Sequence, residues 1–172
     1  RSGEARAWAD SLEDPEAIAT AHAVIAMWMA EKNPAQAATM LTASDFTEEG
    51  VDPAAEQVLN KWMAENPNEA MKWASLLPAG ESRAAGFKTG FAHWINSDPQ
   101  SAFAWASSQN HPIVHHDVID AMVGALSDIP DIIRNSVLES ADPELRAEIE
   151  QGIANVVNQQ SQEAEPEPAP EE

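Results

Sequence analysis

The 172-residue chain contains no Cys and no Tyr, and it has only 9 Lys and Arg residues against 29 Asp and Glu residues. The lack of Cys excludes disulfides, thiolate metal ligands and cysteine nucleophiles, and it leaves the redox compartment open. The formal net charge of −20 disfavours nucleic acids and anionic membranes, because both are bound through Lys and Arg. No apolar run approaches the roughly 18–20 residues of a membrane span. We therefore expect no nucleic acid partner and no direct membrane insertion by this segment.

Large aliphatic side chains are also scarce. Leu, Ile, Val and Phe together number 31, whereas the chain has 32 Ala, 6 Trp and 6 Met residues. Ala is the strongest helix former, and the residues that favour strands are β-branched. Alternation of polar and apolar residues with a period of two is absent, while spacings of three and four recur throughout. This composition predicts a fold that is nearly all-α.

Six of the nine prolines before the C-terminal tail follow Asp or Asn, and each of these pairs predicts a helix start. An Asx side chain caps a free N–H of the first turn, and Pro at the first helical position loses no useful donor. The six pairs are Asp14-Pro15, Asn33-Pro34, Asp52-Pro53, Asn66-Pro67, Asp98-Pro99 and Asp142-Pro143. With the apolar spacing they predict ten helices, at 3–12, 15–32, 34–43, 53–65, 67–77, 81–96, 99–109, 112–127, 130–140 and 143–159. The segment 44–52 is expected to be an inserted, partly ordered connection.

A repeat of 32–33 residues links these helices. The segments 62–74 and 94–106 share a first Trp, the Asx-Pro pair, an Ala and a closing Trp-Ala. An earlier copy places Trp28 and Met40 at the two Trp positions, with one extra residue before the Asx. Leu126 belongs to a degenerate later copy, and Trp8 to a truncated leading one. We expect each Trp pair to pack across a helix junction.

Repeats of this length made of two helices are typical of α-solenoids. The spacing from Pro67 to Trp73 and to Leu76 resembles the tetratricopeptide repeat, and Asp98-Pro99 followed by Ala102 and Trp105-Ala106 is similar to Sel1-like repeats. The resemblance implies a right-handed α-solenoid of four to five stacked hairpins, with a divergent repeat, over residues 1–160. It also implies a non-catalytic role, either as a scaffold for binding another protein or as a structural subunit of a larger assembly. We expect no cofactor.

Three features are candidates for binding a partner. Trp8 lacks a preceding helix in its unit, so its ring is expected at an exposed end. Gly86 and Gly90 form a small-residue stripe with Ser82, which indicates a close approach by another backbone, either within the fold or from a partner. The segment 61–97 is nearly neutral in an acidic chain, and it is the favoured surface for an acidic partner or for the chain's own tail. Its cations are Lys61, Lys72, Arg83 and Lys88.

The alternative function is a metal-binding or hydrolytic domain that uses His111, His115, His116 and Asp117. His111 and His115 are spaced to share one helical face, as zinc ligands often do. Against this, Pro112 places His111 at the helix entrance, and His115 and His116 point in different directions. The chain also lacks a Gly-rich phosphate loop, a nucleophile elbow and a metalloprotease helix motif. We therefore expect no enzyme activity, and ordinary surface histidines are the simpler interpretation.

The ends of the chain carry the remaining expectations. Residues 161–172 contain five acids and three prolines and no large apolar residue, which predicts a disordered acidic tail. The chain begins at Arg1 without an initiator Met, which predicts a processed product or a fragment. The compartment stays undetermined, with a periplasmic or secreted bacterial location as the preferred hypothesis. A high-salt habitat is an alternative explanation of the acidity.

Overall fold

The computed structural model describes residues 2–41 and 52–163, and within these ranges it contains helices and no strand. The predicted all-α class is confirmed. The ten helices are α1 (Ser2–Asp10), α2 (Pro15–Ala30), α3 (Pro34–Ala38), α4 (Pro53–Glu65), α5 (Pro67–Leu76), α6 (Glu81–Ser97), α7 (Pro99–Ser107), α8 (Pro112–Ser127), α9 (Asp131–Leu138) and α10 (Pro143–Glu163). Helix α3 is shorter than predicted and α10 longer. The expected connection, except for Asp52, and tail residues 164–172 lie outside the described residues.

All six Asx-Pro pairs open a helix, as predicted. Each Asx side chain accepts a hydrogen bond from a backbone N–H of the first turn, at 2.8 to 3.2 Å. Asp52 accepts two such bonds, from the first turn of α4. The acid of the expected capping box, Glu69, does not reach back to the helix start but pairs with Lys72 at 2.7 Å. The caps therefore rest on the Asx side chains.

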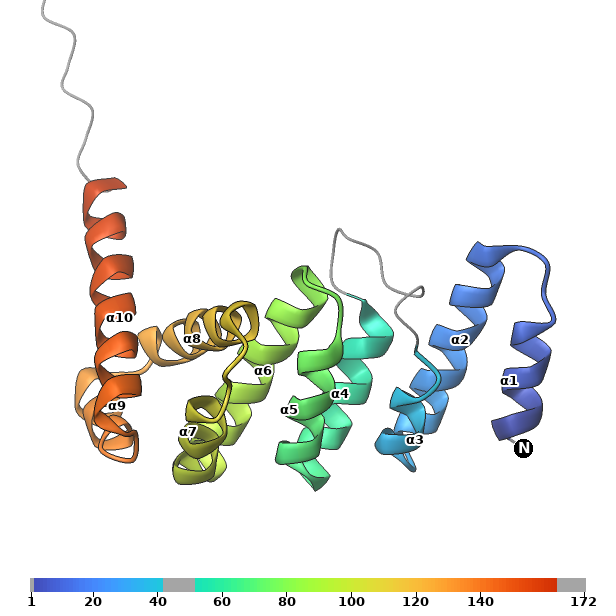
Figure 1. Ribbon diagram of the computed structural model, residues 1–172, viewed down its shortest axis with the longest axis horizontal. Helices are drawn as coiled ribbons and strands as arrows, with labels where there is room; N and C mark the ends of the chain where they lie inside the picture. Colours follow the sequence, from blue (N-terminus) through green and yellow to red (C-terminus); the bar gives the residue numbers. More distant parts are fainter. Residues whose placement is uncertain (1, 42–51, 164–172) are drawn as a thin grey trace, which may run out of the picture.

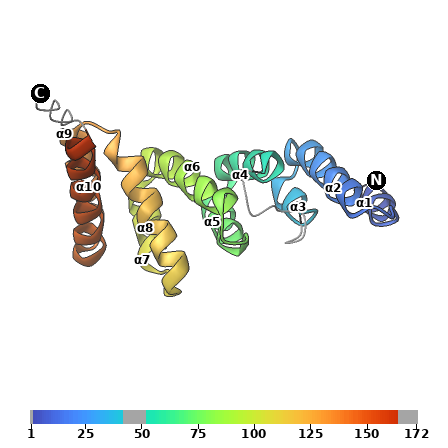
Figure 2. The ribbon, with the colours of Figure 1, turned by 90° about the horizontal axis from the view of Figure 1, so that it is seen from above.

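The helices follow one another in a row, from α1 at one end to α10 at the other (Figure 1). Each long helix of the series α2, α4, α6, α8 and α10 packs against the next. The shorter α3 and α5 each pack against both flanking long helices, while α7 packs mainly on α6 (Figure 2). The N–H of Asp52, before α4, donates to Ser82 Oγ in the first turn of α6 at 2.8 Å. These two long helices therefore begin side by side and run parallel.

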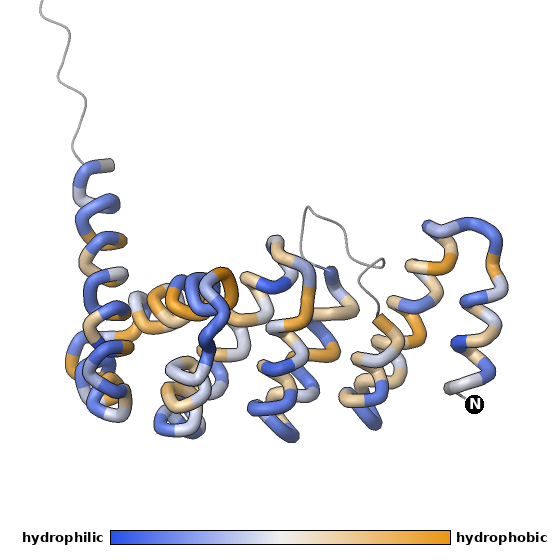
Figure 3. Tube along the Cα trace, viewed as in Figure 1, coloured by the Kyte–Doolittle hydropathy of each residue, from blue (hydrophilic) through white to orange (hydrophobic). Residues whose placement is uncertain are grey.

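The core is continuous along the row and is built around paired Trp rings. Trp62 and Trp73 lie with ring centroids 6.3 Å apart, and Trp94 and Trp105 have the same separation. The predicted packing of both pairs is confirmed. In each helix, hydrophobic residues alternate with hydrophilic ones, as expected where one face is buried (Figure 3). The large core extends from Leu59 to α10, and a smaller Ala- and Met-rich cluster lies between α2 and α4.

The position of Trp28 differs from the prediction. The carbonyls of Trp62 and Trp94 accept from the N–H of the Asx four residues later, and the carbonyl of Met29 accepts from Asn33 in the same way. Met29 is buried, whereas Trp28 is 64% exposed. The assignment of Trp28 to the first Trp position is therefore wrong: Met29 holds this position, and no extra residue precedes Asn33.

Exchanging either Trp for Ala tests this register. Trp94→Ala removes a buried ring and should lower the free energy of unfolding by about 3–5 kcal/mol. Trp28→Ala removes an exposed ring that contacts Lys32, with the ammonium 5.8 Å from the ring centroid, and should change stability by less than about 0.5 kcal/mol. Urea unfolding followed by circular dichroism measures both. Comparable losses in the two variants would contradict the assignment.

The cap at the start of α10 predicts a pH effect. The backbone N–H of Leu145 and the hydroxyl of Ser107 donate to Asp142 and hold the pKa of its carboxyl below the ordinary value of 3.8. Because the folded pKa is lowered, the stabilisation is present above the unfolded pKa and disappears as the pH falls through the folded pKa. Asn at this position keeps an acceptor but does not ionise.

We therefore expect wild type to be more stable than Asp142→Asn at pH values above about 5, and this difference to vanish below about pH 3. Urea unfolding of both proteins across the pH range measures the difference directly, which cancels the general effect of acid on such a charged chain. Glu139→Gln is the matched control, since it removes an exposed acid that caps no helix start. A difference that stays constant through acid pH contradicts the assignment.

Candidate functional site

The predicted basic residues do not form a common patch. Lys61 pairs with Glu31 at 2.9 Å, and its hydrogen bond lowers the pKa of the Glu31 carboxyl. Lys72 pairs with Glu69. Lys88 is exposed, and its aliphatic stem lies over Gly124 of α8. Two of the exposed cations are thus engaged by acids of this chain.

Arg83, the fourth predicted cation, is buried. Its Nε donates to Asp117 Oδ2 of α8 at 2.8 Å, and its Nη1 donates to the carbonyl of Leu77 at 3.4 Å. Arg83 therefore ties α6 to α8 and to the end of α5, and it presents no charge to a partner. A buried ion pair of this kind specifies an arrangement more clearly than it adds stability.

The Gly86 and Gly90 stripe is covered within the fold. A Cβ atom placed on Gly86 would lie 3.1 Å from Leu59 Cδ2, and one on Gly90 would lie 2.4 Å from Met71 Sδ. Both glycines are buried, and they let α6 approach α4 and α5 closely. Of the two causes considered for this stripe, packing within the chain accounts for the geometry.

The four residues of the alternative metal site face different neighbours. His115 Nε2 lies 2.9 Å from Glu148 on α10, His116 lies 3.4 Å from Asp120, and Asp117 binds Arg83. His111 is exposed at the start of α8. Across residues 2–41 and 52–163, no group of three His, Cys, Asp or Glu side chains is placed to hold a metal ion. The cluster is therefore close in sequence without converging in space.

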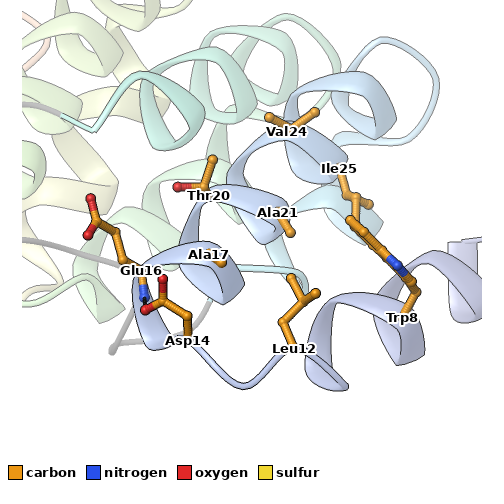
Figure 4. Close-up of a pocket in the computed structure, with 9 residues that line it drawn as sticks. All are labelled: Trp8, Leu12, Asp14, Glu16, Ala17, Thr20, Ala21, Val24 and Ile25. Atoms are coloured by element: carbon orange, nitrogen blue, oxygen red, sulfur yellow. Dashed lines mark hydrogen bonds between the residues drawn. The ribbon is translucent and has the colours of Figure 1, made fainter.

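Trp8 lies where the sequence placed it, in an open groove at the N-terminal end of the row. Its ring is 59% exposed and points from α1 toward Ile25 of α2 (Figure 4). The groove encloses about 590 Å³. Its remaining lining residues are Leu12, Asp14, Glu16, Ala17, Thr20, Ala21 and Val24.

The floor of the groove is apolar and its charge is confined to one end. Asp14 and Glu16, both exposed, lie at the start of α2, whereas Val24 and Ile25 lie two turns further along (Figure 4). Val24 is 56% exposed, a high value for a β-branched apolar side chain. Sequence reasoning found Trp8 and missed the α2 side, although Ala17, Ala21 and Val24 recur there at helical spacing.

Comparison of the chain with protein-family models, with curated proteins and with solved structures finds no match to any of them. In the described ranges, no helix combines the length and the apolar content needed to cross a membrane.

The glycine packing on α6 gives a stability test. Gly90→Ala should lower the free energy of unfolding by about 1 kcal/mol, because displacing the fully buried Met71 outweighs the gain in helix propensity. Gly124→Ala is the matched control: its Cβ would meet Lys88 Cε at 3.7 Å, an ordinary contact, so propensity alone should raise stability by about 0.5–1 kcal/mol. Thermal and urea unfolding measure both variants, and a stabilising Gly90→Ala would contradict the close packing.

Proposed function

We propose that the chain is a non-catalytic scaffold that binds another protein, or a structural subunit of a larger assembly. In this proposal its helices form a right-handed α-solenoid of four to five hairpins, related in design to tetratricopeptide and Sel1-like repeats. Each hairpin of such an array covers its neighbours and leaves extended surfaces for partners.

The observation that carries the repeat is the recurrence of one packing unit along the row. The two Trp pairs have equal centroid separations and stand in the same relation to an Asx-Pro cap. The Ala four residues after each Asx, at positions 37, 70 and 102, is fully buried in all three copies. Agreement in local capping and in side-chain burial supports a common unit.

The character of the open groove supports binding over chemistry. It is lined mainly by apolar side chains, and its two carboxylates lie at the rim of one helix start. Exposed apolar surface of this kind marks sites of protein contact. The predicted catalytic or metal-binding cluster on α8 gives no convergent geometry that favours the alternative.

A complex in the native host tests the proposal. Tagged chain expressed at its natural level should elute from a sizing column in an assembly well above the 18.6 kDa of one chain, with a partner protein in constant ratio. Such an assembly should survive the Trp28→Ala exchange, which leaves the fold intact. Elution as the single chain alone, before and after crosslinking, would overturn the scaffold role.

A further inference from the structure

The groove at the N-terminal end has a covered counterpart inside the row. Six of its lining residues are Trp8, Leu12, Ala17, Ala21, Val24 and Ile25. Moving each by the same 65 positions gives Trp73, Leu77, Ser82, Gly86, Thr89 and Gly90. The first two of these residues lie on and just after α5, and the other four lie on α6. A single shift therefore relates the α1–α2 surface to the α5–α6 surface.

Helix α4 lies on that counterpart surface. The ring of Trp62 packs on Trp73, and Leu59 and Met63 lie over Gly86 and Gly90. Leu77 is 5% exposed beneath this helix, whereas Trp8 and Val24 are both more than half exposed. The α1–α2 surface is thus shaped like a helix seat, and the described residues place no helix in it.

We propose that this groove receives one amphipathic helix of a partner protein, lying parallel to α2 as α4 lies parallel to α6. The inference rests on the proposed scaffold function and names the class of partner. The α4 side chains that face α5 and α6 include Ala55, Leu59, Trp62 and Met63. The partner helix accordingly carries apolar residues at positions i, i+4, i+7 and i+8, with a large side chain at i+7 against Trp8.

Charge at the groove sets the polarity and the flanks of this helix. In the parallel arrangement its N-terminus lies near Ala17, as the start of α4 lies near Ser82. Asp14 and Glu16 are exposed at that end, so they attract the positive end of the helix dipole and any Lys or Arg in its first turn. The occupant is therefore basic in its first turn.

The helix at the far end of the row does not meet this description, which disfavours a second copy as the occupant. The apolar residues Leu145, Ile149 and Ile153 of α10 are already buried in the core. Val157 is the one large apolar side chain of α10 that is strongly exposed within residues 143–162. Polar outer faces of this kind are typical of array ends, whereas the α1–α2 end is apolar.

A peptide made from the chain's own seat-filling helix provides the probe. The peptide has the sequence of residues 52–66 with Glu56→Lys, carries a fluorophore, and is crosslinked between positions 57 and 61. In the full chain Gln57 bonds to Met27 of α2 and Lys61 pairs with Glu31, so in the groove these positions face away from it. The crosslink reduces the entropy lost on binding.

Fluorescence anisotropy with the full chain should show saturable binding of this peptide. Trp8→Ala and Val24→Glu should each weaken it by about tenfold or more, since they remove the anchor and charge the floor. Leu76→Glu is the matched control, because it places the same charge on a 79% exposed residue outside the groove and should leave the affinity unchanged. The peptide that keeps Glu56 should bind about threefold more weakly at low salt, with the difference lost at high salt. Circular dichroism establishes that each variant is folded.

Absence of saturable binding, or equal binding by Val24→Glu, overturns the inference. Sedimentation that shows a dimer of wild type and a monomer of Val24→Glu makes a second copy the occupant and also overturns it. The scaffold role is judged separately: if the native assembly persists in the Val24→Glu chain, the groove assignment fails while the scaffold stands. If wild type shows no native assembly, the scaffold itself fails.

Discussion

The structure depends on one packing constraint: each long helix has apolar side chains on two sides, so it must be covered by a helix on each. Helix α6 illustrates this, with Gly86 and Gly90 facing α4 and α5 while α8 covers it on the opposite side. The shorter helices fill the space between successive long helices, which explains why α3 and α5 each contact two of them. Where the row ends, a long helix keeps one side open unless that side is polar. The two ends solve this differently, because α10 has a mainly polar outer face and α2 does not.

The acidity of the chain has little influence on this core. Most of the described cations are bound to oxygen atoms of the same chain, such as Lys61 to Glu31 and Lys72 to Glu69. These exposed pairs contribute little to stability, but they leave few positive charges for an acidic partner. The buried pair of Arg83 and Asp117 is the exception, because it joins neighbouring long helices in a water-poor setting. The surface offered to other molecules is therefore strongly negative, with apolar exposure concentrated at particular helices.

Local signals made most of the fold predictable. An Asx-Pro pair acts through its own side chain and ring, so all six helix starts follow from a few neighbouring residues. The packing of the Trp pairs was also predictable, since their positions recur with the caps. Burial that depends on distant helices was not: Trp28 and Met29 differ by one position on α2, and only their contacts decide which is buried. For the same reason Arg83 was expected to be a surface cation, and the α2 side of the groove was overlooked.

The distribution of the six Trp residues gives the protein a built-in optical contrast. The most exposed rings, Trp8 and Trp28, belong to α1 and α2, while Trp94 and Trp105 are buried in the middle of the row. A collisional quencher in water reaches the first two rings and is kept from the buried pair. The quenchable share of the intrinsic fluorescence therefore reports on the N-terminal end of the row, and the protected share reports on its centre. Opening of one end can be distinguished from loss of the whole fold without any attached label.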